Sequence, residues 1–318
     1  MSHNSQYPSE SGVSRRQLIR ATAAGAGTLW LGAGIGRTTR AAEAAAAAQP
    51  EIPPEDYRAT GGRIRHSVMA WCFADVPTPQ LIQACARMGL SAMEGIGAEH
   101  YPAIKEAGMG VSLTGSHGFT KGPLDPDNRE MCLAKLREGI DLAAEVGAPG
   151  VITFTGMRKQ GVSDKQAEAN CVECWKQVID YAEEKQVNLC LEHLNTRDDT
   201  HRMKGHPGYF GDDVDLCIDL IKRVDSPRMK LLFDIYHVQI MNGDVIRRIR
   251  QHKDYIGHVH TAGVPGRGEL DDSQEVNYPA VMRALVDVGY QGYVAHEFIP
   301  TWKDQLGALR HGVKVCDV

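Results

Sequence analysis

One pattern constrains the fold of this chain most: after residue 54, an apolar, β-branched run and an amphipathic helical segment alternate eight times. The apolar runs occupy residues 64–73, 92–97, 110–116, 150–156, 188–195, 229–237, 255–262 and 292–299. Parallel strands need a long crossover connection, which is usually a helix. Eight such units in about 270 residues match the size and order of a (β/α)8 barrel. We therefore predict an α/β protein in which residues 49–318 form a single barrel domain.

The ends of the helical segments support this assignment. Ser163 and Gln166 have the spacing of a capping box, in which two side chains satisfy free amide groups at the start of a helix. Several helical segments end in glycine, as at Gly89 and Gly147, and glycine allows the left-handed conformation that turns the chain back. A doubly wound open sheet is the alternative fold. It usually carries a glycine-rich fingerprint after its first strand, and none follows residues 65–73.

Charge and cysteine content argue against some functions. The formal net charge is −5, and no basic run is interleaved with aromatic residues, so we expect no nucleic-acid partner. The eight cysteines lie mostly in apolar stretches, and we interpret them as buried, unreactive thiols. Cys171 and Cys174 form a lone C-x-x-C motif within a helical segment. We assign that motif to packing, because no second pair or thioredoxin-like setting accompanies it.

The first 48 residues resemble an export signal. Arg15 and Arg16 precede an uncharged stretch at 21–36, and an alanine-rich segment up to Ala48 offers small residues for cleavage. This arrangement is similar to a twin-arginine signal. The uncharged stretch is shorter than the roughly 20 residues of a membrane-spanning helix. We therefore expect residues 1–48 to direct export to the periplasm and then to be removed, leaving no membrane contact. An uncleaved anchor or a disordered tail is the alternative.

The last four apolar runs share a feature: each carries a metal-competent side chain near its C-terminal end. These side chains are Glu192, Asp234, His260 and Glu297, and the gaps between them are 42, 26 and 37 residues. Neighbouring strands of a barrel end at the same face, where barrel enzymes keep their active sites. Buried carboxylates need a counter-charge. We therefore predict that the four hold one divalent ion, with Mn²⁺ or Mg²⁺ favoured over Co²⁺ or Zn²⁺ because three of the ligands are carboxylates.

Four segments resemble those of hydroxypyruvate isomerases. They are Leu-Glu-His-Leu-Asn-Thr-Arg at 191–197, Pro-Gly-Tyr at 207–209, Phe-Asp-Ile-Tyr-His at 233–237 and Ala-Gly-Val-Pro-Gly-Arg at 262–267. The wider resemblance is to the xylose-isomerase-like TIM barrels, which include sugar isomerases and epimerases. It implies a Glu–Asp–Gln/His–Glu metal site at the four positions named above. Two residues depart from the hydroxypyruvate isomerase pattern: His260 stands where Gln is typical, as in ketose 3-epimerases, and Gly268 stands where His is expected.

These features predict a metal-dependent isomerase of a small sugar or hydroxy-keto acid, of the hydroxypyruvate and tartronate semialdehyde type. A proton would move beside the carbonyl group through an enediolate. The resemblance implies that Glu192 and Glu297 act both as ligands and as catalytic acid/base residues. Three alternatives stay open: a ketose 3-epimerase, an inosose-type dehydratase, and an exported sugar-binding barrel without turnover. The acidic balance and the single ligand set disfavour a DNA-repair endonuclease.

Further candidate residues surround this site. We predict that His237 and Arg267 bind substrate oxygens, the arginine through a carboxylate or a pair of hydroxyls. A capping histidine and a solvated loop arginine are the alternatives. Glu94 and His117 are weaker substrate-binding candidates, for which a structural role is favoured, and the same holds for Lys121. The resemblance also suggests a homo-oligomer.

Overall fold

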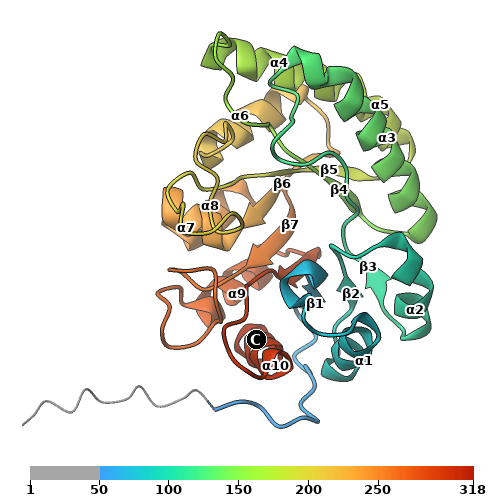
Figure 1. Cartoon of the computed structure of the whole chain (residues 1–318), viewed down its shortest axis with the longest axis vertical. Helices are drawn as coiled ribbons and strands as arrows, with labels where there is room; N and C mark the ends of the chain where they lie inside the picture. The colour runs from blue at the N-terminus through green and yellow to red at the C-terminus, as the bar shows by residue number, and fades with distance from the viewer. Residues whose placement is uncertain (1–50) are drawn as a thin grey trace, which may run out of the picture. The chain divides into compact units, whose positions relative to one another are not determined.

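The computed structural model describes residues 51–318, in which eight strand–helix units follow one another (Figure 1). The expected export segment at 1–48 lies outside the described residues. The strands are β1 (Arg65–Val68), β2 (Ala92–Met93), β3 (Gly110–Val111), β4 (Gly150–Thr153), β5 (Asn188–Glu192), β6 (Met229–Asp234), β7 (Ile256–Thr261) and β8 (Tyr293–His296). The helices are α1 (Thr78–Met88), α2 (Tyr101–Glu106), α3 (Arg129–Val146), α4 (Asp164–Lys176), α5 (Ile179–Glu184), α6 (Val214–Val224), α7 (Ile235–Met241), α8 (Val245–His252), α9 (Tyr278–Asp287) and α10 (Gln305–Cys316). Each predicted apolar run contains one strand.

The strands form a closed ring in which every pair is parallel. Six of them make one sheet in the order β1-β8-β7-β6-β5-β4, and β2 pairs with β3. Two isolated parallel bridges join these sheets: Met69 pairs with Glu94 just beyond β1 and β2, and Thr114 pairs with Val151 between the β3 end and β4. The helices lie outside the ring (Figure 1). The predicted (β/α)8 barrel is therefore confirmed.

Two strands are much shorter than the apolar runs that predicted them. β2 and β3 contain two residues each, whereas the runs span 92–97 and 110–116. Glu94 and Ser112 follow directly after the paired residues and are still buried. An apolar run predicts burial, and here the regular hydrogen-bond ladder ends before the burial does.

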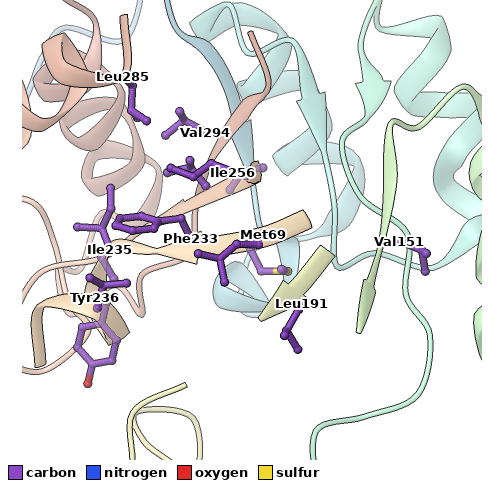
Figure 2. Close-up of a cluster of buried hydrophobic side chains, with 14 of the residues drawn as sticks. Met69, Val151, Leu191, Phe233, Ile235, Tyr236, Ile256, Leu285 and Val294 are labelled. Atoms are coloured by element: carbon purple, nitrogen blue, oxygen red, sulfur yellow. The ribbon is translucent and has the colours of Figure 1, made fainter. Parts of the chain in front are cut away.

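Strand side chains alternate between the two faces of the ring. Those that point outward form the main core against the helices, and Figure 2 shows Leu191 and Phe233 among them. Those that point inward include a small apolar layer of Leu113, Cys190 and Leu232. Glu192 and Asp234 come two residues after the last two members of this layer, so they also face the interior, closer to the C-terminal end. The polar site therefore lies above an apolar floor on the side of β5 and β6, whereas on the side of β7 the same layer contains His258, which pairs in register with Leu232.

Several local predictions are confirmed. Ser163 and Gln166 form a capping box at the start of α4. Gly89 and Gly147, with φ angles of 82° and 74°, end α1 and α3 in the left-handed conformation. All eight cysteines are free and buried, and burial raises the pKa of Cys174 to about 11, which makes its thiol a poor nucleophile. Within residues 51–318, no helix has both the length and the apolar character needed to cross a bilayer.

Candidate active site

Four side chains from neighbouring strand ends meet at the C-terminal face of the ring. Glu192 ends β5, Asp234 ends β6, His260 lies in β7 and Glu297 follows β8. Each offers a ligand atom within 4.8 Å of those of the other three. All four residues are at most 5% exposed. The structure therefore brings together the four residues for which the sequence predicted a shared metal site.

Hydrogen bonds to the backbone hold two of these carboxylates in place. The Tyr209 hydroxyl donates to the Glu192 carbonyl oxygen at 2.9 Å and accepts from the Thr155 amide at 2.9 Å, so it joins the chain beyond β4 to the end of β5. Asp234 caps α7, because its Oδ1 accepts an amide hydrogen of the first turn at 2.8 Å. Because Oδ1 makes this contact, Oδ2 remains available to interact with the other residues of the cluster. In the Pro-Gly-Tyr segment noted in the sequence, it is therefore the tyrosine that contacts the site, by a hydrogen bond to the backbone of Glu192.

Replacing Tyr209 by phenylalanine is expected to remove both of its hydrogen bonds while keeping the buried ring. A buried polar group left without a partner costs about 1–3 kcal/mol, so the free energy of unfolding in urea should fall by that amount. Turnover should fall too, because Glu192 loses its tether. Tyr290→Phe is the matched control: it removes a hydroxyl bond to the Tyr293 carbonyl at the opposite end of the barrel, 2.9 Å long, and should leave turnover unchanged. Wild-type stability and turnover in Tyr209→Phe would contradict this role.

Arg267 brings a positive charge into the cluster. Its Nη2 donates to Glu297 Oε2 at 2.6 Å and lies 3.3 Å from Asp234 Oδ2. Its Nη1 donates to the Met203 carbonyl oxygen in the loop after β5. The side chain is only 2% exposed. The alternative of a solvated loop arginine is therefore wrong.

Burial and close contact shift the pKa values of the cluster in different directions. Burial raises the pKa of both Glu192 and Asp234. Burial alone would also raise the pKa of Glu297, but Arg267 and His260 outweigh it and lower that pKa. Burial alone would lower the pKa of His260, whereas the carboxylates around it, Glu297 first, raise it. Three buried carboxylates face one arginine, so an added cation would complete the charge balance.

The donor set fits a divalent cation. Glu192 Oε1 is buried without a hydrogen-bond partner among residues 51–318, and it lies 3.6 Å from His260 Nδ1, which contacts Glu297 Oε2 at 2.7 Å. Buried polar atoms are nearly always partnered. The separation of 3.6 Å suits two ligands of one ion, each bound at about 2.1 Å. Three carboxylates and one imidazole suit Mn²⁺ or Mg²⁺, and Co²⁺ or Zn²⁺ also accept such donors.

Two further histidines lie beside the cluster. His237 Nδ1 accepts from the Asn195 amide at 3.0 Å, so Nε2 carries the ring hydrogen, and Nε2 has no hydrogen-bond partner. Burial, followed by the charge of Arg267, lowers the pKa of His237, which keeps the ring neutral. His206 was not predicted: its ring centre lies 6.2 Å from that of His237 and 4.1 Å from that of Phe119. Its only signal in the sequence is its position directly before Pro-Gly-Tyr.

The three weaker substrate-binding candidates, Glu94, His117 and Lys121, lie outside the cluster of four ligands. Glu94 Oε1 lies 2.7 Å from His260 Nε2, and Oε2 also has partners, so both oxygens are occupied behind the cluster. This placement supports the structural role that was favoured for Glu94 over substrate binding. His117 Nε2 lies 3.0 Å from the Thr153 hydroxyl and its Nδ1 bonds a backbone carbonyl, which supports the structural role. Lys121 is exposed.

Comparisons with known proteins agree with one another. The family model described as "Xylose isomerase-like TIM barrel" matches residues 82–316. A human protein named "Putative hydroxypyruvate isomerase" is 30% identical, over 79% of this chain and 86% of its own length. A 2-oxo-tetronate isomerase of Pectobacterium atrosepticum is 24% identical, over 75% of this chain and 93% of its own length.

Solved structures share the fold. An AP endonuclease of family 2 from Brucella melitensis is 25% identical, with a TM-score of 0.67 over 77% of this chain and 96% of its own. A D-psicose 3-epimerase, solved in the presence of D-fructose, is 19% identical, with a TM-score of 0.61 over 79% of this chain and 90% of its own. At 19% identity the second likeness concerns the fold alone.

Proposed function

The chain belongs to the xylose isomerase-like TIM barrel family and is an isomerase, and we propose that it uses one divalent metal ion to move a proton beside the carbonyl group of a small hydroxy-carbonyl compound. The observation that carries this proposal is the buried cluster of Glu192, Asp234, His260 and Glu297 next to Arg267. The C-terminal face of a barrel is where enzymes of this fold perform their chemistry.

Two carboxylates of the cluster are assigned to the proton transfer. A bound ion would hold the substrate's carbonyl and adjacent hydroxyl oxygens and stabilise the negative charge that develops on them. Glu192 and Glu297 would take the proton from one carbon and return one to its neighbour, while the hydroxyl proton passes to the former carbonyl oxygen, so that the substrate goes through an enediolate with no atoms gained or lost. Burial raises the pKa of Glu192, which suits a group that must hold a proton for part of the cycle.

Two cationic or hydrogen-donating groups are assigned to the substrate's oxygens. His237 offers a neutral Nε2–H that has no hydrogen-bond partner among residues 51–318 and lies 3.5 Å from Asp234 Oδ2. Arg267 offers the positive charge of a buried guanidinium group, whose Nε has no hydrogen-bond partner among residues 51–318, and this charge suits a carboxylate. A carboxylate distinguishes hydroxypyruvate and tartronate semialdehyde from neutral ketoses. We therefore assign a small hydroxy-keto acid as the substrate class, which agrees with the names of the relatives.

Other functions of the same site are less well supported. A ketose 3-epimerase is the second candidate, favoured by a histidine at position 260. An inosose-type dehydratase would use the same ion but expel water. A sugar-binding barrel without turnover would not require an intact ligand set, and this set is complete. An endonuclease would need a basic surface groove for its substrate, whereas the net charge of this chain is −5.

The proposal is tested by following conversion with ¹³C NMR. The full chain is loaded with Mg²⁺ and incubated with hydroxypyruvate and, separately, with D-fructose. Formation of tartronate semialdehyde supports the proposal. Epimerisation of the ketose at C3 without any conversion of hydroxypyruvate selects the second candidate. No conversion of either compound by a chain that demonstrably binds Mg²⁺ overturns the isomerase mechanism proposed here.

We further propose that residues 1–48 direct export to the periplasm by the twin-arginine route. The support is the Arg15-Arg16 pair ahead of an uncharged stretch. In cell fractionation, the wild-type chain should be found in the periplasm and shortened at its N-terminus. The double variant Arg15→Lys/Arg16→Lys should stay full-length in the cytoplasm. An unchanged distribution of the double variant would contradict this route.

A further inference from the structure

We propose that Glu94 is a positioning residue for the metal centre: it holds His260 Nε2 from inside the barrel and thereby directs Nδ1 to the ion. This inference rests on the proposed function, since it concerns how one ligand of the same site is oriented. Glu94 lies just after β2, whereas His260 lies in β7, so the contact spans the interior of the ring. Both side chains are at most 1% exposed.

The Glu94 carboxylate uses both of its oxygens in this position. Oε1 lies 2.7 Å from His260 Nε2. Oε2 accepts from the Ser112 hydroxyl at 2.5 Å and lies 2.8 Å from His258 Nε2. The Ser112 hydroxyl is in turn 2.6 Å from that of Ser67. This buried polar column, formed by Ser67, Glu94, Ser112 and His258, therefore fixes the carboxylate from several strands at once.

The contact determines which nitrogen of His260 can bind an ion. An ionised carboxylate only accepts hydrogen bonds, so Nε2 must carry the hydrogen that is shared with Glu94. When the ring gives up its other proton to bind an ion, the lone pair is therefore at Nδ1. That atom lies 2.7 Å from Glu297 Oε2 and 3.6 Å from Glu192 Oε1, in the middle of the ligand cluster. Histidine ligands of metal ions generally have their other nitrogen held by such a partner, which orients the ring.

A second cation site is the competing explanation for the group of Glu94, His258 and His260, whose donor atoms also lie close together. The hydrogen bonds argue against it. The Glu94 oxygens are 2.7 and 2.8 Å from the two imidazole nitrogens, and Oε2 also accepts from the Ser112 hydroxyl. Both Glu94 oxygens therefore have protein partners, whereas Glu192 Oε1 in the cluster has none among residues 51–318. The group therefore serves as a support for the cluster above it.

The test compares Mn²⁺ binding by isothermal titration calorimetry in three full-length proteins. Glu94→Gln keeps the shape and an acceptor oxygen but loses the charge that strengthens the bond to Nε2. Its dissociation constant for Mn²⁺ should rise about 10–100-fold, the usual result of losing a ligand's hydrogen-bond partner. Glu99→Gln is the matched control, because it makes the same chemical change on a side chain that is 74% exposed and outside the cluster, and it should change the constant by less than about 3-fold.

A spectroscopic measurement separates positioning from general damage. In ¹⁵N-histidine-labelled, Mg²⁺-loaded wild type, the His260 signals should show hydrogen on Nε2 alone. In Glu94→Gln that pattern should be lost or mixed, even though the circular dichroism spectrum stays that of the wild type. Unchanged Mn²⁺ affinity together with an unchanged ¹⁵N pattern in Glu94→Gln would overturn the inference. A wild-type chain that binds no divalent ion would instead overturn the proposed function, so the two failures are distinguishable.

Discussion

Replacing Glu297 by glutamine is expected to lower kcat by about 10²–10⁴-fold, the range typical of a lost general acid or base. An amide does not take up a proton at neutral pH, and the substitution also removes one of the negative charges that would bind the ion. The substitution leaves Arg267 Nη2 and His260 Nδ1 without the carboxylate that each contacts at 2.6 and 2.7 Å. The affinity for Mn²⁺ should therefore fall together with turnover. Steady-state kinetics and calorimetry measure the two effects.

Glu192→Gln should show a loss of the same size, because this residue supplies the other proton-transfer carboxylate. Glu99→Gln is the control: it makes the same chemical change on a side chain that is 74% exposed, outside the cluster, and should behave like wild type. Turnover within about 10-fold of wild type in both site variants would contradict the assignment of these glutamates to the proton transfer.

Removing the metal ion is expected to abolish turnover and to lower the thermal stability of the chain. The cluster holds three buried carboxylates next to a single arginine, so the ion neutralises charge that the protein alone does not. An ion present at about 1,000 times its dissociation constant stabilises the folded state by about 4.1 kcal/mol. For a domain of this size, that corresponds to a rise in Tm of roughly 8–16 °C.

Calorimetric scans with a chelator, and then with Mn²⁺ or Mg²⁺ added back, measure this shift. Asp234→Asn is the informative companion variant, because its site is already impaired and the chelator should change its Tm little. Full turnover in the presence of excess chelator, with no change in Tm, would show that the cluster works without an ion.

The barrel could be predicted because its signal is local and repeated. Eight apolar runs of similar spacing, each followed by a helical segment, leave few arrangements other than a closed ring. The lengths of β2 and β3 could not be predicted in the same way. Burial continues past the paired residues to Glu94 and Thr114, while closure of the ring there depends on single bridges such as Met69 with Glu94. The sequence pattern predicts which residues are buried, whereas the pairing of two strands depends on how far apart their ends lie in the fold.

The ligand cluster could be expected for a related reason. Glu192, Asp234, His260 and Glu297 each lie near the C-terminal end of an apolar run, and consecutive parallel strands must end side by side. The contact of Glu94 with His260 could not be predicted from the sequence, because it crosses the ring between strands that are not neighbours. The burial of Arg267 was also not predictable, since a glycine-rich loop gives no sign of where its side chains point.

The most direct test of the central claim is solvent exchange. Mg²⁺-loaded enzyme is incubated with its substrate in D₂O, and ¹H NMR follows the carbon-bound hydrogens beside the carbonyl group. Proton transfer through an enediolate predicts that deuterium enters the product at this carbon, and that Glu192→Gln and Glu297→Gln lose the exchange. Conversion of the substrate with no deuterium in the product would contradict the account, because the hydrogen taken from one carbon would then be the one returned to its neighbour, rather than one delivered by a second carboxylate.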